Sequence, residues 1–300
     1  METIKNRSEI LFLYEVENTN PNGDPLNENR PRYDTEENKI LVSDVRLKRT
    51  IRDYWFAYKG FDGTGDKDIF VREVPSEKGG IVDAKERAKQ FKEEPKTVLD
   101  KCIDVRVFGG VIPLEGSSIT FTGPTQFQMG KSLHKVDVVE IQGTGAFASK
   151  AGSQQKTFRT EFVVPYALIG FNGIINEKAA ESTKMTGDDK KLLWEGMWEG
   201  TKNLISRSKF GQNPMLLLVI DYKEPFYIGN LRQRIKLKTN DEKDELQIRS
   251  VNDYWLDFTE IINFLKEYKD KIQKIDFQKD PRLVIKANDK VIESISLETL

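Results

Sequence analysis

Residues 10–58, ILFLYEVENTNPNGDPLNENRPRYDTEENKILVSDVRLKRTIRDYWFAY, form the stretch that decides the expected fold. An apolar run opens it, and the nearly continuous hydrophobic character of residues 9–17 predicts a strand in the centre of a sheet. Residues 18–34 contain three prolines, one glycine and five asparagines, which is typical of a long, ordered surface loop. A short strand at residues 39–42 and a strongly basic helix complete the stretch.

The helix is predicted from its start signal and its periodicity. Ser43 precedes Asp44, and we expect the Ser43 side-chain oxygen to accept a hydrogen bond from the free N–H groups of the first turn. A helix N-terminus beside several cations attracts anions, so a phosphate chain is a candidate ligand. The predicted buried stripe consists of Leu47, Ile51, Tyr54 and Tyr58. The cations on its flanks are Arg46, Lys48, Arg49 and Arg52.

Composition limits the classes of protein to consider. The chain has 300 residues, 38% of them hydrophobic, which suits one large domain with insertions or two modest ones. Its 47 basic and 48 acidic residues give a net charge of −1, so nucleic-acid binding would need a local groove. The single cysteine, Cys102, fits a reducing compartment and is interpreted as a small buried residue. The sequence shows no secretion signal and no membrane-spanning apolar run, which predicts a cytoplasmic chain that does not bind membranes.

The middle of the chain predicts an insertion followed by strands. Residues 60–97 look peripheral, with a strand at 69–74 and a helix at 84–91. A second helix is expected at 96–108, ended by two glycines. Period-two patterns predict strands at 117–127, with a break at Gly123 and Pro124, and at 136–141 and 160–171. Residues 142–159 between the last two form either a protruding hairpin or mobile loop, or an ordinary exposed turn.

The C-terminal part adds two helices, expected at 188–206 and 252–273, and two strands, expected at 215–222 and 282–287. The resulting order of strand, helix, strands, helix and strand is typical of a ferredoxin-like α+β fold.

Catalytic chemistry has few candidates. His134 is the only histidine and no motif surrounds it, so we assign it no catalytic role. Asp24 and Asp34 share a loop with the basic helix and could hold a divalent cation for RNA cleavage. The alternative, which we prefer, is that both carboxylates form turns.

Six motifs resemble one known family. They are NTNPNGDP (18–25), NRPRYD (29–34), LVSDVRLKRTIRDY (41–54), DVRVFGG (104–110), GPTQF (123–127) and VVPYALIGFNG (163–173). Together they resemble the backbone subunit of type I CRISPR effector (Cascade) complexes, in the Csd/Csh branch of the RAMP superfamily. The resemblance covers roughly residues 8–220 in order, and its first fifty residues are the most specific part.

The resemblance implies an α+β, modified RNA-recognition (ferredoxin-like) fold with inserted finger and thumb elements. Such subunits oligomerise along a CRISPR RNA, contact other Cascade subunits and present the guide for pairing with target DNA in antiviral defence. A thumb hairpin, here residues 136–162, displaces one base at regular intervals. The expected organisation is a single domain with insertions at 60–97 and 136–162 and an extension at 223–300, without a cofactor or metal.

The resemblance also implies which side chains contact RNA. The family pattern S-x-x-x-L-K-R-x-I-R falls on residues 43–52, and Arg46, at a variable position, is added for its charge. Phe147 is expected to wedge beside a displaced base, and three hairpin cations to extend the phosphate path. The full set is Asn20, Asn22, Arg30, Arg32, Ser43, Arg46, Lys48, Arg49, Arg52, Gly109, Gln126, Phe147, Lys150, Lys156 and Arg159.

No segment carries the aromatic pattern with which RNA-recognition domains stack bases on their central strands. We therefore expect recognition through helix, loops and backbone contacts, independent of guide sequence. Two alternatives stay open: a metal-dependent ribonuclease that uses Asp24 or Asp34, and a structural protein that binds only other proteins.

Overall fold

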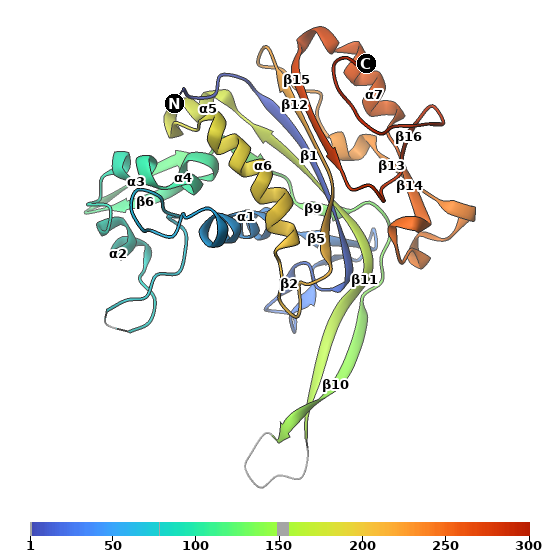
Figure 1. Ribbon diagram of the computed structural model, residues 1–300. Helices are drawn as coiled ribbons and strands as arrows, with labels where there is room; N and C mark the ends of the chain where they lie inside the picture. The colour runs from blue at the N-terminus through green and yellow to red at the C-terminus, as the bar shows by residue number, and fades with distance from the viewer. Residues whose placement is uncertain (1, 78, 149–155) are drawn as a thin grey trace.

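A computed structural model describes residues 2–77, 79–148 and 156–300, with the backbone alone for residues 144–148 and 156–158. Its centre is an antiparallel sheet, with helices on one face and the C-terminal part of the chain on the other (Figure 1). Nine strands of the described chain join this sheet. Their order is β15 (Ile272–Lys279), β12 (Gln212–Tyr222), β1 (Ser8–Thr19), β11 (Lys156–Ile175), β9 (Gly130–Ser132), β5 (Lys39–Val42) and β4 (Tyr33–Asp34), while β8 (Thr125–Phe127) and β10 (Val139–Ala148) also pair with β11. The predicted α+β class is confirmed.

Strand β1 lies in the middle of the sheet, as its apolar run predicts. It pairs antiparallel with β11 on one side and with β12 on the other. Ile10 and Phe12 belong to the hydrophobic cluster on one face, and Leu11 and Leu13 to the cluster on the opposite face. Because successive side chains of a strand point to opposite faces, a continuous apolar run is what a strand covered on both sides requires.

The helical layer consists of α1 (Asp44–Tyr58), α5 (Glu177–Thr183) and α6 (Gly187–Lys202). Gly196 of α6 allows close packing against α1, since a Cβ there would lie 2.8 Å from the Ile51 side chain. The stripe predicted for α1 is correct at Leu47, Ile51 and Tyr54 but wrong at Tyr58, which is 57% exposed. Trp55 takes the buried place instead, and its ring N–H donates to the Leu192 carbonyl at 2.8 Å.

The C-terminal layer covers the other face of the sheet. The elements of this layer are η1 (Leu231–Arg234), β13 (Lys236–Thr239), η2 (Asn240–Glu242), η3 (Glu245–Gln247), η4 (Val251–Asp253), β14 (Tyr254–Asp257), α7 (Thr259–Glu267), η5 (Lys269–Lys271), β16 (Ile285–Ala287) and β17 (Lys290–Val291). The helix predicted at 252–273 is wrong outside α7, because β14 pairs with β13 and β16 in a second small sheet. The strand expected at 282–287 is reduced to β16.

A third hydrophobic cluster lies beside the helical layer. It involves α2 (Ala84–Lys89), α3 (Pro95–Lys101), α4 (Ile103–Phe108), β6 (Gly109–Leu114) and β7 (Ser117–Thr122). The strand predicted at 69–74 is absent from the described residues, because the N–H groups of Phe70 and Val71 donate to the Asp104 carboxylate instead of to a neighbouring strand. The helix predicted at 96–108 breaks at Cys102, whose extended backbone forms a β-bridge with Asp68.

Strands β10 and β11 continue beyond the sheet as a long hairpin that projects from the body of the molecule (Figure 1). Its register runs from Val139 opposite Val163 to Ala148 opposite Lys156. For the part of residues 142–159 that the structure describes, the hairpin alternative is therefore confirmed; residues 149–155 lie outside the described residues. The strand predicted at 136–141 starts only at Val139, and α6 ends at Lys202, short of residue 206. A small two-stranded pair, β2 (Gly23–Asp24) and β3 (Arg30–Pro31), lies in the loop after β1. No helix of the described residues has both the length and the apolar character needed to cross a bilayer.

Candidate nucleic-acid interface

The loop after β1 is fastened to the start of α1. The Asn22 side-chain oxygen accepts hydrogen bonds from the Ser43 N–H at 2.8 Å and from the Ser43 hydroxyl at 2.9 Å. Ser43 does occupy the cap position of the helix, but its side chain makes no cap hydrogen bond. The expected capping by Ser43 is therefore wrong, because its hydroxyl donates to the loop. Asn20 is buried in the same loop, and its amide donates to the Asn29 carbonyl at 2.7 Å.

The two loop aspartates interact with the protein itself. The Asp24 carboxylate accepts from the Leu26 N–H at 3.3 Å and lies 3.5 Å from the Arg32 guanidinium. The Asp34 carboxylate accepts from two N–H groups of the following turn and from Lys131 at 2.9 Å. These hydrogen bonds lower the pKa of Asp34, with Lys131 contributing most. Both carboxylates thus shape turns, and no group of three or more His, Cys, Asp or Glu side chains in the described residues could hold a metal ion.

The four cations of α1 have different environments. Arg52 lies 2.9 Å from the fully buried Asp104 carboxylate, and Lys48 lies 2.9 Å from Asp44. Arg49 pairs with Asp53 at 2.7 Å on the helix surface, where both side chains are half exposed. Arg46 has no side-chain hydrogen bond or ion pair within the described residues. The helix therefore presents Arg46, which has no ion pair among the described residues, and the half-exposed Arg49 to a ligand, whereas the Lys48 and Arg52 side chains are largely buried in their ion pairs.

A fifth cation, Lys209, faces Arg46 from the segment between α6 and β12. Its ammonium donates to the backbone carbonyl of Asn20, and the Asn20 N–H donates to the Ser208 carbonyl at 3.2 Å. Burial, together with the charge of Arg46, lowers the pKa of Lys209 to about 8. The sequence does not single out Lys209, because residues 206–210, SRSKF, form a polar stretch that carries no motif.

The base of the hairpin completes this face. The Glu161 carboxylate pairs with Arg159 and, at 2.9 Å, with Arg207, so one negative charge faces two positive ones. Arg30 lies over the Phe162 ring with its guanidinium carbon 4.0 Å from the ring centre. A cavity of about 850 Å³ lies on the Arg30 side of this ring, and a second of about 220 Å³ lies between the loop after β1 and Arg207.

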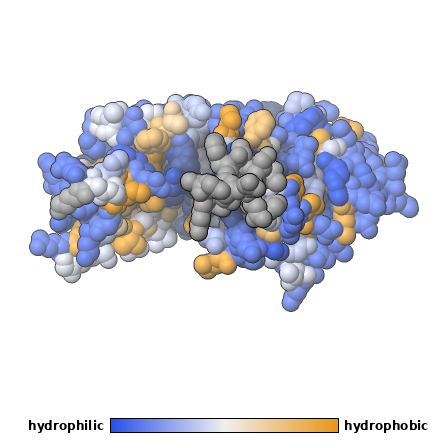
Figure 2. Space-filling view, turned by 90° about the horizontal axis from the view of Figure 1, so that it is seen from below, coloured by the Kyte–Doolittle hydropathy of each residue, from blue (hydrophilic) through white to orange (hydrophobic). Residues whose placement is uncertain are grey.

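The surface of the molecule on this side is mostly polar. Figure 2 shows the molecule from below relative to the view of Figure 1, which is the side from which the hairpin projects. Hydrophilic residues cover most of this face, and apolar side chains are scattered among them. Two large apolar residues, Leu26 in the loop after β1 and Phe210 in the segment before β12, are 96% and 70% exposed. We call the cations around the loop after β1, the start of α1 and the base of the hairpin the hairpin-base surface, which consists of Arg30, Arg32, Arg46, Arg49, Arg159, Arg207 and Lys209.

Several predicted residues do not join this surface. Gly109 is buried, and a Cβ there would lie 2.2 Å from the Phe121 carbonyl oxygen, so its role in the structure is close backbone packing. Gln126 pairs through β8 with Ile174, eleven residues along β11 from Val163 at the hairpin base, or roughly 36 Å at about 3.3 Å per residue. Phe147 and Lys156 lie in β10 and β11, whose side chains there are not described. Lys150 lies outside the described residues.

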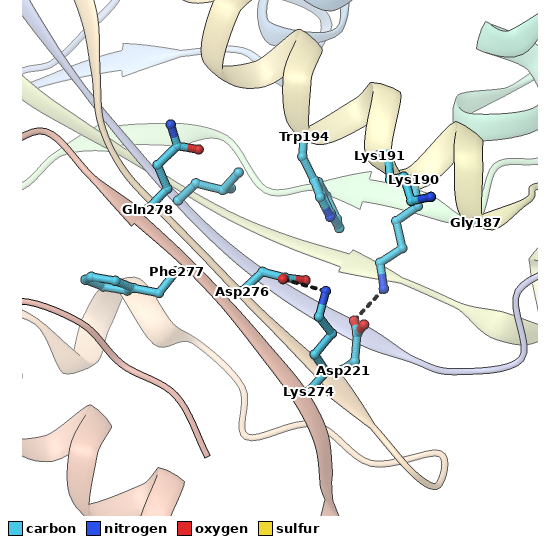
Figure 3. Close-up of a pocket in the computed structure, with 10 residues that line it drawn as sticks. Gly187, Lys190, Lys191, Trp194, Asp221, Lys274, Asp276, Phe277 and Gln278 are labelled. Atoms are coloured by element: carbon cyan, nitrogen blue, oxygen red, sulfur yellow. Dashed lines mark hydrogen bonds and ion pairs between the residues drawn. The ribbon is translucent and has the colours of Figure 1, made fainter. Parts of the chain in front are cut away.

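Another cavity, of about 410 Å³, lies between α6 and the strands β12 and β15 (Figure 3). Trp194 projects into it from α6, and two ion pairs line it. These pairs are Lys190 with Asp221 at 2.5 Å and Lys274 with Asp276 at 2.6 Å. A third lysine of the lining, Lys191, pairs with Asp188 at 3.1 Å, so each cation of this cavity already has a carboxylate partner.

Comparisons with known proteins agree with the sequence motifs. The family described as "CRISPR-associated protein Cas7" matches residues 6–259. The chain is 31% identical over 318 residues to a protein of that description from Haloferax volcanii, covering 97% of this chain and 92% of that protein. Chains of two solved structures, described as "CRISPR RNA-guided surveillance complex, pre-nicking" and "CRISPR RNA-guided surveillance complex", superpose with TM-scores of 0.53 and 0.50 at 12% and 14% identity. Each superposition covers 88% of this chain, and 89% and 84% of the other chains respectively, which shows a shared fold. The resemblance seen in the motifs is thereby confirmed, and the chain belongs to the CRISPR-associated protein Cas7 family.

Proposed function

We propose that this chain is a non-catalytic backbone subunit that binds a CRISPR RNA, oligomerises along it with other copies and presents it for pairing with target DNA in antiviral defence. The observation that carries the proposal is the hairpin-base surface. It brings together cations from the loop after β1, from α1, from the hairpin and from the segment before β12, on a chain whose net charge is −1. A concentration of positive charge on an otherwise balanced protein is the electrostatic feature of a nucleic-acid groove.

The covered sheet explains why RNA would bind here. An ordinary RNA-recognition domain leaves the sheet face opposite its helices open for base stacking. In this chain that face contributes Leu11, Leu13 and Tyr166 to a buried cluster under the C-terminal layer. Bases cannot stack on side chains that are already buried, so RNA must bind at the rim of the sheet. Contacts there are made mainly to phosphates and are independent of base sequence, which suits a subunit that accepts any guide.

We interpret the architecture as a modified RNA-recognition fold. The order β1, α1, β8, β11, α6 and β12, with β1 between β11 and β12, is the split βαβ arrangement. In this interpretation the chain is a single domain with insertions near 60–97 and 136–162 and a C-terminal extension at 223–300. The projecting hairpin corresponds to the thumb and the third hydrophobic cluster to the finger. Phe147, Lys150 and Lys156 then belong to the thumb and contact RNA, with Phe147 placed as the wedge beside a displaced base.

The test compares two double variants that remove the same charge from different places. Arg46→Ala with Arg49→Ala removes the two α1 cations of the hairpin-base surface. The matched control, Lys178→Ala with Lys191→Ala, removes two exposed cations of α5 and α6, which follow the Ile175 end of β11. The assay is the affinity of the purified chain for a labelled single-stranded RNA across a salt series, with thermal unfolding as a check on folding.

We expect the Arg46/Arg49 variant to bind more weakly and to flatten the dependence of log K on log salt by about 0.7 for each lost phosphate contact. The control variant should bind as the unmodified chain does. An equal loss in both variants would mean that RNA binding uses bulk charge and not this surface. If the unmodified chain neither binds RNA nor co-purifies with nucleic acid, the protein-only alternative is correct.

The proposal also states that the chain does not cut RNA. The assembled complex is incubated with a complementary RNA and magnesium or manganese. The complementary RNA should stay intact, because Asp24 and Asp34 already form turns and ion pairs with the protein. Periodic cuts that disappear in Asp24→Ala or Asp34→Ala would establish the ribonuclease alternative.

A further inference from the structure

Two cations of the hairpin-base surface, Arg46 and Lys209, act on each other's charge, and neither has an ion pair among the described residues. Arg46 extends from the first turn of α1, and Lys209 is held by its hydrogen bond to the Asn20 carbonyl. Within the described residues neither cation forms an ion pair with a carboxylate, although the charge of Asp53 partly offsets the lowering of the Arg46 pKa. The charged and titratable groups around them interact with other groups or lie at the surface: Asp44 pairs with Lys48, Asp53 with Arg49, Glu161 with Arg159 and Arg207, Glu17 is exposed, and Tyr14 is buried.

This arrangement is unfavourable in the free protein. Removing a cation from water and placing it beside a like charge both disfavour the charged form. Burial lowers the pKa of Arg46, and burial together with the Arg46 charge lowers the pKa of Lys209 to about 8. Groups held in such an environment by the surrounding structure are often part of a binding site.

We propose that Arg46 and Lys209 together hold one phosphate group of the bound RNA. The proposal rests on the RNA-binding function proposed above and assigns one contact of that interface. A guanidinium can donate to two phosphate oxygens at once, and an ammonium adds a point charge from another direction. Asn20 acts as a positioning residue, because its carbonyl fixes the Lys209 ammonium and its N–H fixes the backbone at Ser208.

This contact couples RNA binding to proton uptake. A phosphate beside Lys209 stabilises the charged ammonium and raises the Lys209 pKa towards its ordinary value. In the free protein Lys209 loses its proton as the pH rises through about 8, so binding at higher pH must first restore that proton. Affinity for RNA should therefore fall as the pH rises. Tyr14, whose hydroxyl faces Arg46, has a pKa raised by burial and keeps its proton throughout this range.

The experiment measures the affinity of the full chain for a labelled oligoadenylate at about pH 7 and about pH 9, at constant ionic strength. Adenine does not titrate between these values, so changes in affinity report the protein. The variants are Lys209→Arg, which keeps its charge throughout, and Lys209→Gln, which has none. Lys191→Arg and Lys191→Gln are the matched controls, since Lys191 is 81% exposed on α6.

The unmodified chain should lose about tenfold in affinity between the two pH values, since one pKa unit corresponds to a factor of ten. Lys209→Arg should bind well at both values, and Lys209→Gln should bind about tenfold more weakly at pH 7 and lose its pH dependence. Both Lys191 variants should behave as the unmodified chain.

If Lys209→Arg and the unmodified chain share the same pH dependence, or if Lys209→Gln binds normally, the proposed phosphate contact is wrong while RNA binding itself stands. If neither the unmodified chain nor any of the variants binds oligoadenylate or a mixed-sequence RNA, the proposed function is wrong instead.

Discussion

Replacing Arg52 by alanine should destabilise the fold, although its helix was expected to contact phosphate at this position. Arg52 donates through Nε to the Asp104 carboxylate at 2.9 Å, and Asp104 has no exposed surface. Among the described residues, the hydrogen-bond donors left to that carboxylate without Arg52 would be the N–H groups of Phe70 and Val71, at 2.8 and 3.1 Å. Breaking one partner of a buried ion pair typically costs about 3–5 kcal/mol of unfolding free energy, because a buried charge remains uncompensated.

Arg49→Ala is the matched comparison on the same helix. Arg49 pairs with Asp53 four residues on, and their side chains are 52% and 50% exposed. An exposed pair at this spacing contributes at most about 0.5 kcal/mol to stability. We therefore expect Arg49→Ala to leave the urea midpoint nearly unchanged while weakening RNA binding. Arg52→Ala should lower the urea midpoint but leave RNA affinity nearly unchanged when the affinity is measured under conditions in which the variant is folded.

Urea unfolding followed by tryptophan fluorescence measures the first quantity, and affinity for labelled RNA measures the second. Trp55 lies on α1 and is fully buried, so it reports the packing of this helix. The double variant Arg52→Ala with Asp104→Asn should recover part of the lost stability, since it removes the uncompensated charge. Normal stability together with lost RNA affinity in Arg52→Ala would refute this reasoning and restore Arg52 as a phosphate contact.

Three further substitutions test other parts of the structure. Gly109→Ala should lower the unfolding free energy by about 2–3 kcal/mol, because φ is +71° and the new Cβ would meet the Phe121 carbonyl; retained thermal stability would contradict this packing. Asp34→Ala should lower the thermal midpoint, since the carboxylate accepts two turn N–H groups, and a variant as stable as the parent would show that these bonds contribute nothing. Lys209→Met should stabilise the RNA-free chain by about 1–2 kcal/mol at neutral pH. That gain should shrink as the pH rises from about 8 towards 10.5. In this pH range the unfolded chain binds more protons than the folded chain, so the parent becomes more stable as the pH rises. Urea midpoints of the parent and the variant at several pH values measure the gain.

The parts of the fold that could be predicted are those in which local pattern and tertiary environment agree. Strand β1 is apolar at successive positions and is covered on both faces, and α1 has a clear stripe. The prediction failed where tertiary contacts override local pattern. Residues 252–273 have a helical apolar spacing throughout, yet Tyr254–Asp257 joins a strand pair formed with residues 236–239 and 285–287. Such pairing depends on partners that the local sequence does not reveal.

The sequence indicates which segments form the candidate interface, but it does not indicate the surroundings of their individual side chains. The loop after β1 and the basic helix do lie together, linked by Asn22 and Ser43. The four cations of α1 appear equivalent in the sequence, because the acid that neutralises Arg52 lies fifty-two residues away at Asp104. The sequence does not point to Lys209 for the same reason, since only the fold brings it to Arg46.

The C-terminal layer and the hairpin-base surface are connected by one physical requirement. A sheet buried on both faces gains stability from two clusters but loses the flat aromatic surface on which a single strand could stack. Binding must then depend on charges placed at the ends of strands and helices, where the backbone turns and side chains reach solvent. Charges in these positions can stay unpaired only if the surrounding fold holds them, as the Asn20 carbonyl holds Lys209. In our proposal the energy lost by confining Arg46 and Lys209 is recovered when a phosphate binds between them, which makes the free subunit less stable than its RNA-bound form.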